Sequence, residues 1–141
     1  MMNRSIDTIF FDVGATLRYV VEDDAFSAAA DKALMELAGA REPRDVFFEK
    51  LTANWKAYRK WAKDSLLDVS EMELWLQHLL PDYPAERVAP NAARLTRLWR
   101  DHDGRRVPHD GVKETLIELR RRGYKLGIIA NTITETEIPD W

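Results

Sequence analysis

The fold is decided by residues 6–17, which read IDTIFFDVGATL. The apolar run that opens this stretch, with two isoleucines and two phenylalanines, stops at Asp12. A short apolar run that ends at polar residues and a glycine is typical of a buried strand in a parallel sheet. The carboxyl end of such a strand is where open α/β sheets bind their ligands. Asp12 is therefore a candidate nucleophile or metal ligand, although aspartates at strand ends also form turns and cap helices.

The composition of the chain is that of a folded globular protein and excludes several kinds of site and partner. The chain has 141 residues, of which 45% are hydrophobic and 32% are charged, and these values are typical of one folded domain or one domain with an insertion. A net charge of −3 gives no general attraction to nucleic acid or to anionic membranes. No cysteine is present, which excludes disulfides and cysteine nucleophiles. The N-terminal apolar run is too short for a signal peptide or a membrane span, so we expect a cytoplasmic protein with no nucleic-acid or membrane partner.

Residues 20–103 carry a helical pattern. Apolar side chains recur there at helical spacing in four segments, whose ends are marked by glycine, proline and a capping box. The marking residues are Gly39, Pro43, Ser70 with Glu73, and Pro84. Aromatic residues concentrate in these segments, and we expect most of them to be core. Trp61 lies off the main stripe of its helix and is the better candidate for a pocket or an interface.

A second buried strand is predicted at residues 124–129, after a helix at 110–122 that Gly123 ends. Without residues 20–103, the chain reads as strand, helix, strand, which is one right-handed β-α-β crossover. The two strands are then parallel neighbours, and their carboxyl ends bring Asp12 to the same edge as residues 130–132. The predicted fold class is α/β, with two parallel strands, an inserted helical region, and mostly helix by residue count.

The order of these features resembles the haloacid dehalogenase-like (HAD) hydrolase superfamily. Residues 9–17 resemble its first motif, an apolar strand that ends in Asp-x-Asp-x-Thr. Residues 108–131 resemble the approach to its second motif, where a strand ends in Ser or Thr followed by Asn. The resemblance covers essentially the whole chain. It implies a partial Rossmann-like core at 1–19 and 104–141 and an α-helical cap at 20–103.

The resemblance also implies phosphatase-like chemistry on a small phosphorylated molecule, through an aspartyl-phosphate and with Mg²⁺ in most members. Asp12 matches the nucleophile and one metal ligand, and the backbone carbonyl of Gly14 matches another metal ligand. Thr16 matches the threonine that braces the motif. Asn131 matches the motif asparagine, and Thr132 is a substitute for the hydroxyl that binds the phosphoryl oxygen. We therefore take Thr16, Asn131 and Thr132 as substrate-binding candidates.

The sequence departs from the family pattern at several points. Gly14 replaces a second aspartate that acts as general acid and base, a role typically worth about 10²–10⁴-fold. Ala130 replaces a Ser or Thr, and no later lysine or acidic strand end follows. We therefore expect weak Mg²⁺ binding and a weakly active or incomplete catalyst. The chain reads as a truncated hydrolase, or as one that a homodimer or another partner completes at its open sheet edges.

Two alternatives follow from these departures. One is a non-catalytic regulatory or assembly module on a degenerate HAD fold. The other is a metal-independent 2-haloacid dehalogenase, because members with that activity also lack the second aspartate.

Overall fold

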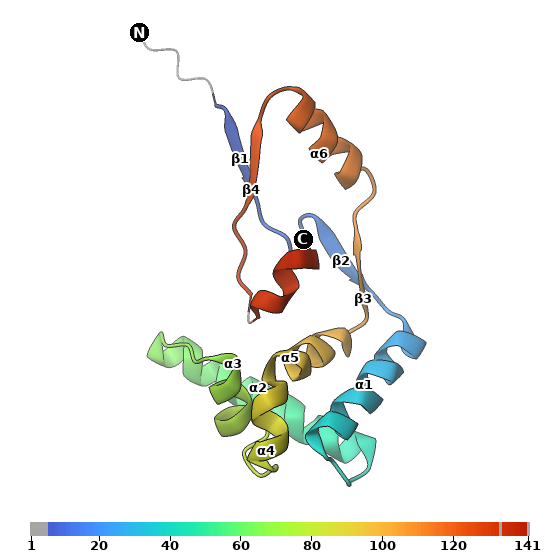
Figure 1. The fold of residues 1–141 in the computed structure, drawn as a ribbon, viewed down its shortest axis with the longest axis vertical. Coiled ribbons are helices and arrows are strands. Elements are labelled where there is room, and N and C mark those ends of the chain that lie inside the picture. Colours follow the sequence, from blue (N-terminus) through green and yellow to red (C-terminus); the bar gives the residue numbers. More distant parts are fainter. Residues whose placement is uncertain (1–5, 133, 141) are drawn as a thin grey trace.

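The computed structural model describes residues 6–132 and 134–140 and has a mixed α/β architecture that is mostly helical (Figure 1). This confirms the coarse fold class. The strands are β1 (Thr8–Phe11), β2 (Arg18–Val21), β3 (Arg105–Pro108) and β4 (Lys125–Ile128). The α-helices are α1 (Asp24–Ala38), α2 (Arg44–Ser65), α3 (Glu71–Glu73), α4 (Ala85–Val88), α5 (Ala92–Asp101) and α6 (Val112–Arg121). A π-helical turn, η1 (Leu74–Leu79), and two 3₁₀ segments, η2 (Ala89–Asn91) and η3 (Glu135–Asp140), complete the description.

The helix ends follow the predicted signals. Gly39 ends α1 in the left-handed conformation, with φ of 77°, which glycine adopts without a steric penalty. At the start of α3 the Glu73 amide donates to Ser70 Oγ at 3.3 Å, and the Ser70 amide donates to Glu73 Oε2 at 3.1 Å. This reciprocal pair is the predicted capping box. Pro43 and Pro84 immediately precede α2 and α4, as expected.

β1 and β4 pair in parallel, as the sequence predicts, with Ile9 opposite Leu126 and Phe11 opposite Ile128. The pairing continues beyond β4, because the Ile129 amide donates to the Phe11 carbonyl at 2.9 Å. The chain segments that leave the two strands therefore start side by side. Asp12 begins one of these segments.

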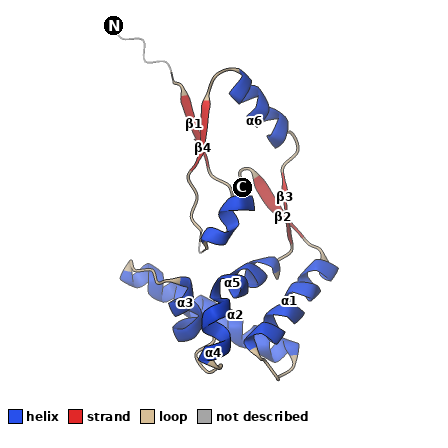
Figure 2. Ribbon diagram, in the orientation of Figure 1, coloured by secondary structure: helices blue, strands red, loops and turns tan. Residues whose placement is uncertain are grey.

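The second strand pair was not predicted. β2 pairs antiparallel with β3, with Tyr19 opposite Val107, so the helical pattern expected for residues 20–103 is wrong for residues 20 and 21. The sequence does not mark this pair, because residues 18–21 show no alternation of apolar and polar side chains and their partner strand lies far along the chain. Tyr19 and Val20 are 43% and 46% exposed, so their burial is incomplete as well. Figure 2 shows this pair between the β1–β4 pair and the helices. The boundary expected between the core and the cap, after residue 19, therefore falls inside β2.

The hydrophobic core lies in the helical unit, defined here as α1 to α5 with the turns between them. Its largest fully buried apolar side chains come from α1, α2, η1 with the residue after it, α4 and α5, and are Leu34, Phe47, Leu51, Trp75, Leu79, Leu80, Val88 and Leu95. The one polar atom of Trp75 is satisfied, because Nε1 donates to Thr96 Oγ1 at 2.8 Å. By contrast, Phe10 of β1 is 59% exposed and Ile117 of α6 is 58% exposed. The core cluster is therefore formed by the helical unit, and the strands lie outside it.

Two leucine-to-alanine variants test where the core lies. Leu51 is fully buried and Leu67 is 61% exposed. We expect Leu51→Ala to lower the free energy of unfolding by about 2–5 kcal/mol, because it leaves a cavity. We expect Leu67→Ala to change it by no more than about 0.5 kcal/mol. Urea unfolding followed by circular dichroism measures both values, and equal losses would contradict this account of the core.

Candidate active site and adjoining pocket

Asp12 follows β1 into a tight turn that the backbone closes. The amides of the two residues after Thr16 both donate to the Val13 carbonyl, at 3.0 and 3.2 Å. Ala15 adopts the left-handed conformation, with φ of 58°, which is uncommon for a residue other than glycine. The turn brings Thr16 back over the strand end, where its Oγ1 donates to Asp12 Oδ2 at 3.3 Å. The structure therefore brings these two predicted site residues together.

Gly14 lies in the same turn with open space around it. A Cβ at this position would meet no heavy atom within 4 Å, and the backbone there is outside the left-handed region. Neither packing nor backbone conformation requires glycine. The turn would accept the aspartate that the family pattern has at this position.

The segment after β4 carries the other two predicted site residues. Asn131 and Thr132 are both exposed. The Thr132 hydroxyl donates to the Thr134 carbonyl at 2.9 Å and accepts the Thr134 amide at 3.2 Å. Within the described residues, no hydrogen bond joins either side chain to Asp12. The predicted site is therefore in two parts. One part follows β1 and the other follows β4, and these two strands are neighbours.

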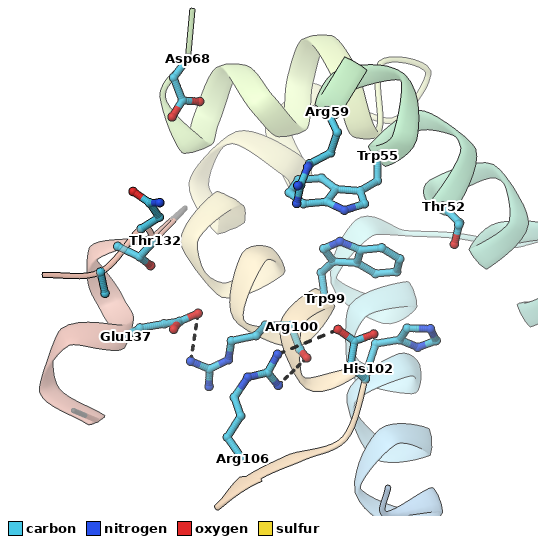
Figure 3. A pocket seen from close by; sticks show the side chains of 13 residues that line it. Thr52, Trp55, Arg59, Asp68, Trp99, Arg100, His102, Arg106, Thr132 and Glu137 are labelled. Atoms are coloured by element: carbon cyan, nitrogen blue, oxygen red, sulfur yellow. Dashed lines mark hydrogen bonds and ion pairs between the residues drawn. The ribbon is translucent and has the colours of Figure 1, made fainter. Parts of the chain in front are cut away.

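A pocket of about 1010 Å³ opens between the segment after β4 and the helical unit (Figure 3). Its walls come from α2, from the end of α5 with the turn that follows, and from β3 and η3. The lining residues are Thr52, Trp55, Arg59, Asp68, Trp99, Arg100, His102, Asp103, Arg106, Ala130, Asn131, Thr132 and Glu137. Asp12 is not in this lining. The pocket therefore adjoins the β4 side of the predicted site.

Trp55 and Trp99 were not predicted as pocket residues, and Trp61, which was expected at a pocket or an interface, does not line this pocket. The Trp61 ring lies against Tyr58 and His78, with centroids 5.9 and 5.1 Å apart, and is outside the lining. Helical spacing indicates which residues share a face of one helix. It does not indicate where two helices diverge and leave a gap, and Trp55 and Trp99 border such a gap between α2 and α5.

Ion pairs connect η3 to the rest of the molecule. Glu137 is 7% exposed, and its carboxylate contacts Arg18 Nη2 at 2.9 Å and Arg100 Nη1 at 3.1 Å. The contact with Arg100 has the distance of an ion pair but lacks the direction of a hydrogen bond. Burial, and then the charge of Arg100, lower the pKa of Arg106 beside it. These contacts hold η3 against β2 and α5, so they also position the wall of the pocket that follows β4.

The pocket lining has balanced charge, since three arginines face three carboxylates. Two of the arginines, Arg100 and Arg106, are engaged with carboxylates of this network. Arg59 differs, because its guanidinium lies 5.9 Å from the Trp55 ring and it has no ion pair with a described residue. Arg59 is therefore the cation of the pocket that is available to an anionic ligand.

Few protein ligands for Mg²⁺ are expected at Asp12. Within residues 6–132 and 134–140, no three His, Asp or Glu side chains form a group that could hold a metal ion. Asp12 and the Gly14 carbonyl are the two predicted oxygen ligands, and water or substrate oxygens would complete the octahedral coordination of Mg²⁺. Binding of Mg²⁺ therefore stays a prediction, and no chemical step below depends on it.

Comparisons with protein-family models, curated proteins and solved structures found no match to this chain. The HAD resemblance consequently depends on the motifs and on the parallel strand pair alone. No helix in the described part of the chain combines the length and apolarity that crossing a membrane requires.

The alkaline titration of Tyr58 tests the geometry at the rim of the pocket. Its hydroxyl donates to Asp68, and burial, followed by this contact, raises the pKa of Tyr58 to about 12. Because this value exceeds the ordinary pKa of about 10, the contribution to stability is complete below pH 10 and is lost as the pH rises through 12. We expect Asp68→Asn to lower the pKa of Tyr58, as measured by tyrosinate absorbance. Asp64→Asn, on the same helix end, is the control and should leave the titration unchanged.

Proposed function

We propose that this chain is an HAD-like hydrolase that transfers a phosphoryl group from a small molecule to Asp12 and then to water. The observation that carries the proposal is the position of Asp12. Its carboxylate follows a strand, accepts a hydrogen bond from Thr16 at 3.3 Å, and starts beside the segment that leaves the parallel neighbour. A nucleophile needs such a fixed position, because alignment with the phosphorus atom removes much of the entropic cost of reaction.

The reaction has two steps. An Asp12 oxygen forms a bond to phosphorus, the bond from phosphorus to the ester oxygen breaks, and the electron pair leaves on that oxygen. Water then attacks the phosphorus of the aspartyl-phosphate, which returns the carboxylate, releases inorganic phosphate and gives a proton to solvent. Covalent catalysis of this kind divides one difficult displacement into two easier ones. Thr16 orients the carboxylate for the first step.

The helical unit has a supporting role in this proposal. It faces the segment after β4 across the pocket, and its side chains form most of the lining (Figure 3). A cover of this kind excludes water from the reacting group and contacts the remainder of the substrate. The helical unit is therefore suited to substrate selection, while Asp12 and Thr16 supply the chemistry.

Replacing Asp12 tests the proposal directly. We expect Asp12→Asn to lower the hydrolysis of a phosphate ester by roughly 10⁴-fold or more, because the nucleophile is lost. Asp7→Asn is the matched control, since Asp7 is an exposed aspartate directly before the same strand, at its opposite end. Phosphate release measures turnover, and intact-mass spectrometry of acid-quenched protein detects the phosphorylated intermediate. Unchanged turnover in Asp12→Asn would refute the assignment.

Gly14 provides a second test. We expect Gly14→Asp to increase hydrolysis of an alkyl phosphate by up to about 10²-fold, because the new carboxyl supplies a proton to the departing alkoxide and fits the open space. Gly14→Asn is nearly the same size but donates no such proton, so it should give no increase. An equal effect of both substitutions would contradict a role for the missing acid.

A second candidate, a 2-haloacid dehalogenase, is favoured by the same open, acid-free position at Gly14. An Asp12 oxygen would attack the substituted carbon, and the halide would leave with the electron pair, so no proton donor is needed. Water then cleaves the ester to give the 2-hydroxy acid. Chloride release from a short 2-chloroacid distinguishes this activity from phosphate release. A chain that releases neither product would instead fit the non-catalytic assembly module.

A further inference from the structure

Two tryptophans face the pocket from different helices. Trp55 comes from α2 and Trp99 from α5, and Figure 3 shows one indole above the other. No ring contact joins them in the described part of the chain, although each contacts other rings. Trp99 stacks on His102 with centroids 5.2 Å apart and planes 10° apart, and Trp55 lies 5.8 Å from Tyr58. We call the space between the two indoles the slot.

The wall of the slot at Trp99 is held rigidly. The ring behind it, His102, also stacks on Phe48 at 4.6 Å and 9°. His102 Nδ1 lies 2.6 Å from Oδ1 of Asp31, whose side chain is 2% exposed. Because these contacts hold the ring behind Trp99, little ordering is required when a flat ring enters, and such preorganisation favours binding. Stacking on indoles suits aromatic rings of many shapes.

The polar side of the pocket suits an anion. Arg59 runs alongside the Trp55 indole and has no ion pair with a described residue. Asn131 and Thr132 form another wall of the same pocket. A ligand with an aromatic ring in the slot and an anionic group at this polar wall would therefore use both kinds of lining.

Gly14 points independently to the same class of molecule. Without an acid at this position, the ester oxygen must leave unprotonated. A phenol has a pKa of about 10, whereas that of water is about 15.7 and alcohols are comparably weak acids. A phenolate therefore leaves far more readily than an alkoxide when no proton is supplied.

We propose that the substrate is an aryl phosphate monoester, with its ring between Trp55 and Trp99 and its phosphoryl group toward the segment after β4, which starts beside Asp12. This inference rests on the function proposed above. The Asp12 oxygen bonds to phosphorus, the bond from phosphorus to the aryl oxygen breaks, and the phenolate leaves with the electron pair and is protonated by solvent.

Binding of unreactive phosphonates tests the slot separately from turnover. Phenylphosphonate and methylphosphonate contain a phosphorus–carbon bond that this chemistry does not cleave. By calorimetry we expect the protein to bind phenylphosphonate about tenfold more tightly than methylphosphonate, because stacking adds to the affinity. Trp55→Leu and Trp99→Leu should each remove most of this preference. Trp61→Leu is the control, since Trp61 lies on α2 outside the pocket, and it should keep the preference.

Conservative variants keep the test decisive if a leucine variant fails to fold. Phenylphosphonate should quench tryptophan fluorescence and methylphosphonate should not. Trp55→Phe and Trp99→Phe should each lose part of the quenching, whereas Trp61→Phe should keep it.

Three outcomes separate the two proposals. Equal binding of the two phosphonates, or an equal loss in Trp61→Leu, overturns the slot whatever the turnover is. A phenyl preference that depends on Trp55 and Trp99, combined with Asp12-dependent turnover, supports both proposals. The same preference with turnover that persists in Asp12→Asn supports the slot and overturns the proposed reaction.

Discussion

The buried carboxylate of Asp31 connects α1, α2 and the end of α5, and the arrangement of the pocket depends on it. Asp31 of α1 accepts from Arg44 Nε of α2 at 2.8 Å and contacts His102, directly after α5, at 2.6 Å. A carboxylate this deeply buried is tolerated because both partners are present, and losing one of them would leave a charge without compensation. The contact lies where the chain leaves the helical unit for β3. It therefore fixes both the direction of that strand and the ring that supports Trp99.

The apolar core and the proposed site lie in different parts of the molecule. The apolar core is confined to the helical unit, while Asp12 and Thr16 belong to a thin strand pair with exposed apolar side chains on both of its strands. Polar contacts connect the two parts, above all those of Glu137 with Arg18 and Arg100. The pocket between them is consequently shaped by ion pairs at its edge and by aromatic stacking on its helical wall. Neither depends on a large sheet.

Sequence reasoning succeeded where the signal is local and failed where it is tertiary. β1, β4 and the helix ends at Gly39 and Ser70 carry their own patterns of apolar spacing and caps, so they were predictable. The turn that brings Thr16 over Asp12 is also local. β2 and β3 were missed because neither carries alternation and each depends on a distant partner. Trp55 and Trp99 were read as core because helical spacing does not reveal the gap between α2 and α5.

The parallel register has a kinetic consequence. Ile9 pairs with Leu126, so the helical unit that lies between them in the sequence must be synthesised before β1 meets its neighbour. The contacts within the helical unit join residues much closer in sequence, and such contacts form earlier because less chain entropy is lost on closing the loop. We therefore expect the helices to fold first and the strand pair to form late. Asp12, the carboxylate that we propose as the nucleophile, would then reach its position only after the helices have folded.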